Sequence, residues 1–395
     1  MCLKPALAPY AAVHNIYGML PVLLDQIADS PFPGAESPPR RWLPFAARAP
    51  KSLLMRSVKS VNLALQGGGA HGAFTWGVLD RLLEERRVEI DAISGTSAGA
   101  MNAVVLASGY QKGGRDGARA ALESFWRAVS RDGRMSPIQR GLMDRLMGNW
   151  SLDKNPFFLA MDLATHFVSP YDFNPFNINP LRELLEREVD FDALRKSRDI
   201  RIFLSATNVH TGKVRVFQGK EITADVVMAS ACLPFLFKAV EIDGTPYWDG
   251  GYVGNPPLFP FFRTGEGGDI LLVQTNPVIR EETPQSARDI MNRINEITFN
   301  ASLASEFRAI GYVNRMLGSK LLRRFTGKTT PEVRLHRIEA GESLLDLTSS
   351  SKFNIDWSFF QHLRDIGRDA TDEFLKRHFR AIGRRSTLDL KKEGG

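Results

Sequence analysis

Ser97 stands in a turn that can make its hydroxyl a nucleophile. Residues 95–99 have the sequence Gly-Thr-Ser-Ala-Gly, so Gly95 and Gly99 flank the serine in a Gly-x-Ser-x-Gly pattern. In hydrolases this pattern forms a sharp turn between a strand and a helix, which projects the serine hydroxyl above the sheet. A hydroxyl also needs a neighbouring base, and donors for the oxyanion that forms on attack. On its own, the pentapeptide is equally a tight glycine turn with a helix-capping serine.

A glycine-rich segment begins 30 residues before this serine (97 − 67). Consecutive glycines at the start of a helix expose backbone N–H groups, which form a ready site for an anion. We therefore expect these amides to face a tetrahedral intermediate on Ser97. The segment also satisfies the dinucleotide-binding pattern Gly-x-Gly-x-x-Gly, with Glu89 or Asp91 as the ribose acid, so an enzyme that uses NAD(P) is an alternative. The segment comprises Gly67, Gly68, Gly69, Ala70, His71 and Gly72.

Asp249 is the third candidate, because Gly250 and Gly251 follow it in a loop-like sequence. Its plain interpretation is an Asp-Gly turn. Ser97 still needs a base, and an ordinary α/β-hydrolase takes that base from a late histidine. No late histidine lies in a loop-like segment, and the backbone of His71 is expected to matter more than its ring. The histidines after the Asp-Gly-Gly segment are His336, His362 and His378.

The segments around these turns have the pattern of a parallel α/β fold. Residues 61–65 and 88–94 are short and apolar, as buried strands are, and residues 73–87 have helical periodicity. A small-residue helix is expected over residues 100–108, so strand, turn and helix occur twice in succession, which is typical of a parallel sheet. Further predictions are strands over residues 201–208, 214–217 and, as the last of the sheet, 270–274, a helix over 181–188, and an amphipathic helix around 353–366.

The three motifs, in this order, resemble those of the patatin-like phospholipase family. The resemblance covers residues 61–275 and implies a three-layer α/β/α fold with a mostly parallel central sheet. It implies hydrolysis of lipid esters by a Ser-Asp dyad, with Ser97 as nucleophile, Asp249 as base and residues 67–69 as the oxyanion hole, without metal or cofactor. The family often carries Arg or Lys where His71 stands, so electrostatic support of the oxyanion is expected to be weaker or pH-dependent here. A catalytically idle lipid-binding protein is the second alternative.

The chain is expected to have three regions. Residues 1–58 form a proline-rich, basic extension, residues 59–282 the patatin-like catalytic domain, and residues 283–395 a mostly helical region packed on the core. No Asp or Glu occurs from residue 37 to residue 79, whereas six Lys and Arg occur between residues 40 and 59. A solvated linker explains such a stretch, and peripheral contact with an anionic membrane is the functional alternative.

Composition narrows the remaining classes of protein. With 43% hydrophobic and 24% charged residues, the 395-residue chain is globular rather than disordered. No run of about 18 apolar residues predicts a membrane span. Two cysteines, Cys2 and Cys232, are too few for a disulfide framework and favour a reducing compartment. There is no metal-binding Cys/His spacing and no nucleic-acid motif, despite a net charge of +7. We therefore expect a cytoplasmic protein that acts on a lipid ester, peripherally at a membrane.

Overall fold

The computed structural model describes residues 58–393, except for residues 142–143, 145–146, 166, 264–267, 318–332 and 345–346. All of them belong to one structural unit, Val58–Gly395. The proline-rich extension and nearly all of its basic stretch lie outside the described residues, so their predicted contact with a membrane stays a prediction.

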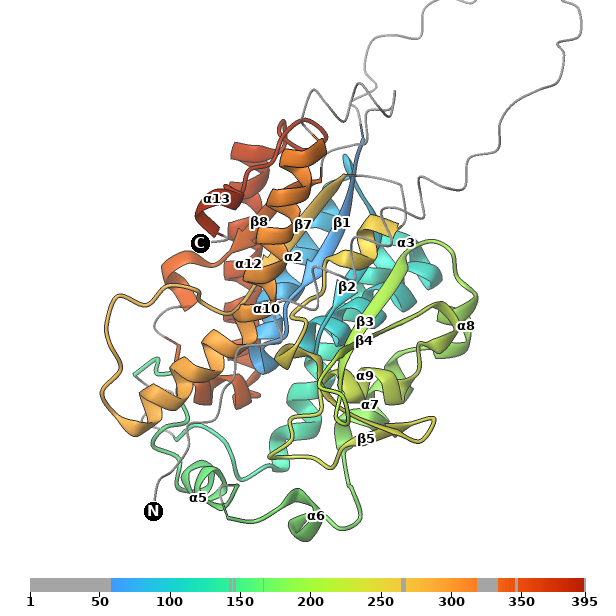
Figure 1. The fold of residues 1–395 in the computed structure, drawn as a ribbon. Coiled ribbons are helices and arrows are strands. Elements are labelled where there is room, and N and C mark those ends of the chain that lie inside the picture. Colours follow the sequence, from blue (N-terminus) through green and yellow to red (C-terminus); the bar gives the residue numbers. More distant parts are fainter. Residues whose placement is uncertain are drawn as a thin grey trace, which may run out of the picture. The chain divides into compact units, whose positions relative to one another are not determined.

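A sheet of eight strands crosses this unit (Figure 1). The strands β3, β2, β1, β7 and β8 are parallel neighbours in this order. Strands β4 and β6 pair antiparallel with β3, and β5 pairs antiparallel with β6. This arrangement confirms the predicted mostly parallel sheet. The strands are β1 (Lys59–Leu65), β2 (Val88–Gly95), β3 (Arg201–Asn208), β4 (Val214–Gln218), β5 (Val240–Ile242), β6 (Thr245–Asp249), β7 (Asp269–Gln274) and β8 (Arg334–Glu339).

The helices lie on both faces of the sheet (Figure 1). None of the described helices combines the length and the apolarity that a bilayer span requires. The helix after Ser97 is much longer than the predicted 100–108, and it departs from helical geometry at Gly113 and Gly114, where helix propensity is lowest. The helices are α2 (Gly72–Glu84), α3 (Ala98–Asp132), α5 (Pro156–Ala164), α6 (Pro170–Phe173), α7 (Pro180–Glu188), α8 (Phe191–Lys196), α9 (Ala224–Ser230), α10 (Ala287–Leu317), α12 (Trp357–His378) and α13 (Leu390–Glu393).

Successive residues of the central strands enter two different cores. Leu63 and Leu65 of β1 pack into one core, while Ala64 between them packs into the other. Leu271 and Leu272 of β7 divide in the same way, because neighbouring side chains of a strand point to opposite faces. The helices α2, α3 and α12 contribute to the first core and α10 to the second. Both faces are therefore covered, which confirms the three-layer α/β/α fold.

Strand β8 corrects the prediction that residues 270–274 form the last strand. It pairs in parallel with β7 over its whole length. Its sequence, Arg-Leu-His-Arg-Ile-Glu, lacks a continuous apolar run because β8 lies at the edge of the sheet. Only a strand buried on both faces shows such a run in its sequence. The C-terminal part of the chain thus adds a strand to the sheet as well as helices.

Helix α12 packs closely on α2 through two glycines. A Cβ atom at Gly77 would lie 1.9 Å from the carbonyl oxygen of Arg364, and one at Gly367 would lie 2.2 Å from that of Phe74. Any side chain at either position would push the two helices apart. Helix α12 is therefore held against α2, the helix that follows the glycine-rich turn.

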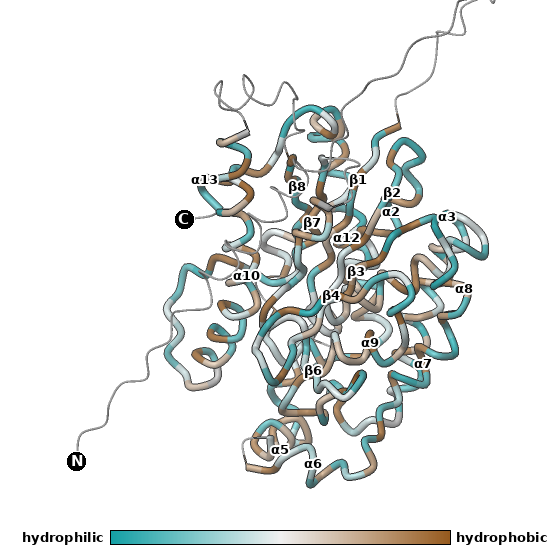
Figure 2. The backbone as a smooth tube through the Cα atoms, turned by 45° about the vertical axis from the view of Figure 1, so that its right-hand side comes forward, coloured by the Kyte–Doolittle hydropathy of each residue, from teal (hydrophilic) through white to brown (hydrophobic). Residues whose placement is uncertain are grey.

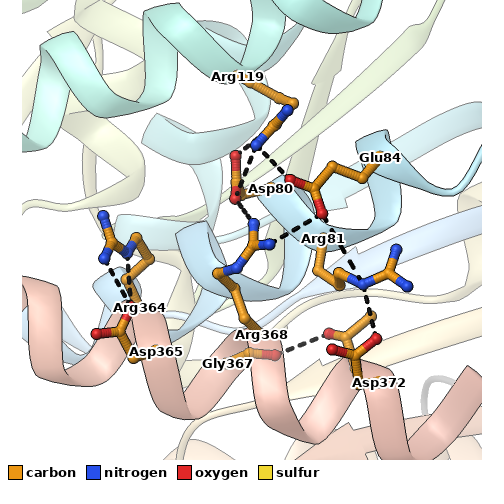
Figure 3. A network of polar contacts seen from close by, with 10 residues as sticks. Asp80, Arg81, Glu84, Arg119, Arg364, Asp365, Gly367, Arg368 and Asp372 are labelled. Atoms are coloured by element: carbon orange, nitrogen blue, oxygen red, sulfur yellow. Dashed lines mark hydrogen bonds and ion pairs between the residues drawn. The ribbon is translucent and has the colours of Figure 1, made fainter.

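Ion pairs reinforce this helix contact (Figure 3). Their charged groups lie on α2, α3 and α12, and each pair is partly exposed, so each contributes modestly on its own. Several of them share Asp80 and Glu84, which makes them a network rather than isolated pairs. The distances are 2.7 Å for Arg81–Asp372, 2.7 Å for Arg119–Asp80 and 2.9 Å for Arg368–Glu84.

Candidate active site

Ser97 occupies a strained turn between β2 and α3. Its φ of 54° and ψ of −121° lie in a region that residues with side chains rarely adopt. Gly95 and Gly99 allow the turn, since a Cβ atom at Gly99 would lie 2.2 Å from the carbonyl oxygen of Leu65. The backbone N–H of Ser97 donates to Ser230 Oγ at 2.9 Å. The turn therefore has the strand–turn–helix setting that the sequence predicts.

Asp249 lies at the end of β6, beside Ala206 of β3, and its side chain is buried. Its carboxylate accepts the N–H of Gly251 at 2.7 Å, and the side chain of Ser97 lies close enough to lower its pKa. Its own backbone N–H donates to the carbonyl of Cys232 at 2.8 Å. The fold thus brings together two residues that are 152 positions apart (249 − 97).

Burial determines the protonation behaviour of Asp249. Removal from water raises the pKa of the carboxyl from 3.8 to about 7, against the opposing effects of the Gly251 N–H, the Ser97 hydroxyl and the Lys352 charge. A carboxylate with a pKa near neutrality can both accept and return a proton at physiological pH. Asp249 therefore has the environment of a general base, which an exposed aspartate lacks.

The glycine-rich segment passes directly beside Ser97. A Cβ atom at Gly67 would lie 2.8 Å from Cβ of Ser97. The Gly67 N–H donates to Asn255 Oδ1 at 2.7 Å, so this amide is already satisfied by the protein. Among the described residues, no acceptor is found for the N–H groups of Gly68 and Gly69, and the latter has a left-handed φ of 57°. Of the three predicted donors, these two are therefore the ones without an acceptor among the described residues.

Side-chain donors of neighbouring loops hold the glycine-rich segment in position. The carbonyl of Gly67 accepts Asn276 Nδ2 at 2.7 Å and Thr275 Oγ1 at 3.1 Å. Both donors follow β7, and Asn255 follows the Asp-Gly-Gly turn. Sequence analysis did not identify these residues, because an isolated Asn or Thr gives no signal until the sheet places it beside the glycines.

The supporting glycines are required by close contacts. A Cβ atom at Gly72 would lie 2.7 Å from Cβ of Ala98, where α2 and α3 begin side by side. At Gly250 it would lie 2.4 Å from the Ser205 carbonyl oxygen, and at Gly251 2.2 Å from the ring of Phe299. Ala70 is also buried. These positions therefore shape the turns around the dyad rather than react.

His71 is buried and neutral. Its Nε2 pairs with Ser351 Oγ at 2.7 Å, and burial together with the nearby Lys352 lowers the pKa of its ring to about 3. It therefore offers no positive charge to an oxyanion at any pH near neutrality. The expected pH-dependent support from His71 does not follow from this environment.

Lys352 supplies a positive charge that sequence analysis did not find. It lies in the short 3₁₀ turn Ser349–Phe353, and its carbonyl oxygen would be 2.6 Å from a Cβ atom at Gly69. Its Nζ donates to Asn276 Oδ1 at 2.9 Å, and its charge acts on both Asp249 and His71. Burial lowers the pKa of Lys352 itself, against the opposing charges of Glu296 and Asp249. In its charged form, this lysine is a cation that the C-terminal part of the chain contributes to the site.

The NAD(P) alternative conflicts with this geometry. The glycine turn follows the end of β1, whereas Glu89 and Asp91 lie in the first half of β2, with Glu89 paired to Ser60 at the start of β1. A ribose acid has to lie at the same edge of the sheet as the glycine turn.

Among the described residues, no group of three or more His, Cys, Asp and Glu side chains could hold a metal ion.

The late histidines are engaged elsewhere. His336 is buried on β8, 2.8 Å from Asp269, and the ring of His362 stacks on Trp150. Neither is bonded to Ser97 or Asp249, whose hydrogen bonds are given above.

Comparison with known proteins places the same three motifs in one family. The patatin-like phospholipase family matches residues 63–262. Lysophospholipase nte1 from Aspergillus terreus (strain NIH 2624 / FGSC A1156) is 26% identical over 234 residues, which are 59% of this chain and 13% of that protein. The cGAMP-activated phospholipase of Escherichia coli (strain TW11681) is 27% identical over 220 residues, 50% of this chain and 53% of that protein. VipD from Legionella pneumophila has a solved structure with a TM-score of 0.40 and 17% identity, covering 80% of this chain and 67% of that one.

The first of these relatives is much longer than the present chain, which spans only 13% of it. The family match, in contrast, takes in half of this chain and includes the glycine-rich segment, the Ser97 turn and the Asp249 turn. The chain belongs to the patatin-like phospholipase family.

Proposed function

We propose that the protein is a lipid acyl hydrolase of the phospholipase A or esterase type, which acts through a Ser97–Asp249 dyad. The observation that carries the proposal is the position of the Ser97 side chain, in a strained turn, next to the buried carboxylate of Asp249, whose pKa it lowers. The names of the relatives, a lysophospholipase and a phospholipase, support a lipid ester as the substrate.

In the first half-reaction, the Ser97 oxygen attacks the ester carbonyl while Asp249 takes its proton. The N–H groups of Gly68 and Gly69 stabilise the oxyanion of the tetrahedral intermediate, a contribution typically worth about 10²–10³ in rate for each donor. The intermediate then collapses, the acyl–oxygen bond breaks, and Asp249 returns the proton to the leaving alcohol. The acyl group remains on Ser97.

In the second half-reaction, Asp249 takes a proton from water as the water oxygen attacks the acyl-enzyme carbonyl. The bond between the acyl carbon and the Ser97 oxygen then breaks, Asp249 returns the proton to that oxygen, and the fatty acid leaves. The positive charge of Lys352 favours the ionised form of the base. Without this charge, only the Gly251 N–H and the Ser97 side chain would oppose burial, so the pKa of Asp249 would be higher and less of the carboxylate would be ionised at neutral pH.

A panel of lipid esters tests the substrate class. Purified protein is incubated with phosphatidylcholine, lysophosphatidylcholine and mono- and triacylglycerols, and released fatty acid is quantified by mass spectrometry. We expect release from at least one class, and no release by Ser97→Ala. Ser124→Ala is the matched control, because Ser124 lies exposed on the same helix, away from the turn. Equal release by wild type and Ser97→Ala would overturn the proposal.

A further inference from the structure

Large apolar side chains are exposed around the two short helices α5 and α6. Phe167 is 81% and Phe176 85% exposed. Single exposed apolar residues are ordinary, but a concentration of phenyl rings in about 20 residues is not. We call this set the aromatic patch; it consists of Phe157, Leu163, Phe167, Tyr171, Phe173 and Phe176.

The local fold of this segment does not depend on burying these rings. Asn155 caps α5 by accepting the N–H of Phe158, and Ser169 caps α6 by accepting that of Tyr171. A proline at the start of each helix fixes its first turn. The backbone is therefore ordered by caps and prolines while the rings remain in water. Figure 2 shows hydrophobic stretches along α5 and α6 at the lower edge of the molecule.

The aromatic patch is attached to the candidate active site at two points. The ring of Phe158 packs on Phe353, the neighbour of Lys352, with their centroids 5.8 Å apart. At the other end, Lys238 Nζ donates to the carbonyl of Pro175 at 2.8 Å and lies over the ring of Tyr171. The carbonyl of Lys238 accepts the thiol of Cys232, whose own carbonyl holds the N–H of Asp249.

A second apolar set borders the glycine-rich segment. Ile279, in the loop after β7, is 76% exposed, and the first turns of α10 expose three isoleucines at positions 290, 294 and 297. Their spacing of four and three residues puts them on one face of the helix. Asn300 of α10 connects this region to the site, since it donates to the carbonyl of Pro277 at 3.0 Å and accepts Gln66 Nε2 at 3.1 Å.

Both sets lie at the end of the sheet where the parallel strands lead to the Ser97 and glycine turns. Figure 1 shows α5, α6 and the start of α10 at this lower end. The charged residues within the α5 and α6 helices are Asp162 and Asp172, and residues 279–297 contain three arginines and four acidic residues, so neither apolar set has a basic excess. Its attraction to a partner must therefore come from apolar contact and not from opposite charge.

We propose that the aromatic patch and the exposed isoleucines of the α10 start form a membrane-docking surface that inserts into zwitterionic lipid. The choice of a lipid surface rests on the proposed function, because the two apolar sets flank the turns that would receive a lipid ester. It differs from the contact predicted for the basic stretch of residues 40–59, which would need anionic lipid and low salt.

Vesicle flotation of the full-length protein tests the docking surface. We expect binding to neutral phosphatidylcholine vesicles that is nearly equal at 0.1 and 0.5 M NaCl. The double variant Phe167→Ser/Phe176→Ser should bind about 100-fold more weakly, roughly tenfold for each inserted ring. Tyr312→Ser is the matched control, since Tyr312 is an exposed aromatic residue near the opposite end of α10, and it should bind as wild type does.

A fluorescent variant gives an independent reading of insertion. Phe176→Trp should show a blue-shifted emission with vesicles, and quenching by lipids that carry a nitroxide on the acyl chain. Unchanged binding by the double variant would overturn the proposal. Binding that disappears at 0.5 M NaCl would also overturn it. So would sedimentation experiments in which the aromatic patch joins two copies of the chain while the protein does not bind vesicles.

The docking surface and the proposed function can be tested separately. The double variant should hydrolyse a monomeric, water-soluble p-nitrophenyl ester like wild type, because its substitutions lie outside the dyad. Ser97→Ala should bind vesicles like wild type. Vesicle binding without ester hydrolysis would leave the docking surface standing and reject the hydrolase, whereas hydrolysis with unaltered vesicle binding in the double variant would do the reverse.

Discussion

Asp249 and Asp269 are both buried at the ends of strands, yet their surroundings shift the pKa of the two carboxyls in opposite directions. Asp269 accepts hydrogen bonds from Arg334 at 2.7 Å and His336 at 2.8 Å. Burial acts to raise its pKa, but these partners outweigh burial and lower the pKa to about 2. Asp249 instead accepts a backbone N–H and lies next to the Ser97 hydroxyl, and burial raises its pKa to about 7.

Under the proposed function, the difference separates a structural carboxylate from a reactive one. Asp269 joins β7, β8 and the N–H of Gly383 at 2.8 Å in a network that keeps it ionised. Among the described residues, no cation is bonded to Asp249, and its neighbour is a serine in a strained turn. A buried carboxylate whose pKa is moved toward neutrality, beside a nucleophile, is the arrangement expected of a functional site.

The largest expected effect is a loss of activity when Ser97 or Asp249, the two residues of the proposed dyad, is replaced. Ser97→Ala and Asp249→Asn should each lower kcat/KM for p-nitrophenyl butyrate at least about 10³-fold, because nucleophile and base act as one unit. Circular dichroism should show both variants folded. Activity of either variant within tenfold of wild type would contradict the assigned roles.

Asp269→Asn should instead lower stability. Its folded-state pKa lies below the unfolded value of 3.8, so its stabilisation is present above that pH and lost as pH falls toward 2. At pH 7 the substitution leaves Arg334 and His336 without their anion, and such a loss typically costs about 3–5 kcal/mol. Urea unfolding measures this change. An unaltered urea midpoint, or loss of activity in the folded variant, would contradict a purely structural role of Asp269.

Asp249→Asn should have the opposite effect on stability. The folded-state pKa of Asp249 lies above the unfolded value, so its favourable contribution is present below about pH 3.8 and lost as pH rises through about 7. Asn does not ionise, so at pH 8 the variant should be more stable by on the order of 1–4 kcal/mol. The gain should shrink when urea unfolding is repeated at pH 5. A variant less stable than wild type at pH 8 would contradict the raised pKa.

Lys352→Gln gives the smallest expected effect. The lysine charge lowers the pKa of Asp249, so its removal should move the acidic limb of the kcat/KM profile to higher pH, by less than about one unit. The pH profile of p-nitrophenyl butyrate hydrolysis measures the shift. Lys220→Gln, on the exposed turn after β4, should leave the limb where it is in wild type. A limb that moves to lower pH would reject the role of Lys352.

Much of this arrangement was predictable from local sequence. The strands of residues 61–65, 88–94 and 201–208 were recognisable as short apolar runs, and the Ser97 turn from its glycines. Helix α3 was predicted too short, because the pattern weakens near Gly113 and Gly114. Strand β8 was missed because its sequence, Arg-Leu-His-Arg-Ile-Glu, has neither a continuous apolar run nor a strict alternation of apolar and polar residues.

The contribution of distant residues to the site was not predictable. Asn255 and Asn276 hold the glycine-rich segment, and Lys352 adds a charge from the C-terminal part of the chain. None of them lies in a motif, and only the three-dimensional fold places them beside Ser97. Sequence spacing thus predicted the candidate reacting groups but not the residues that surround them and adjust their pKa.

The rate at which a fluorophosphonate probe labels the protein between pH 5 and 9 tests the central claim most directly. If Asp249 is the base for Ser97, the wild-type rate should rise about tenfold per pH unit and level off near pH 7. Asp249→Asn should label slowly at every pH, Ser97→Ala not at all, and Asp269→Asn like wild type while folded. A wild-type rate independent of pH, or rapid labelling of Asp249→Asn, would contradict the account.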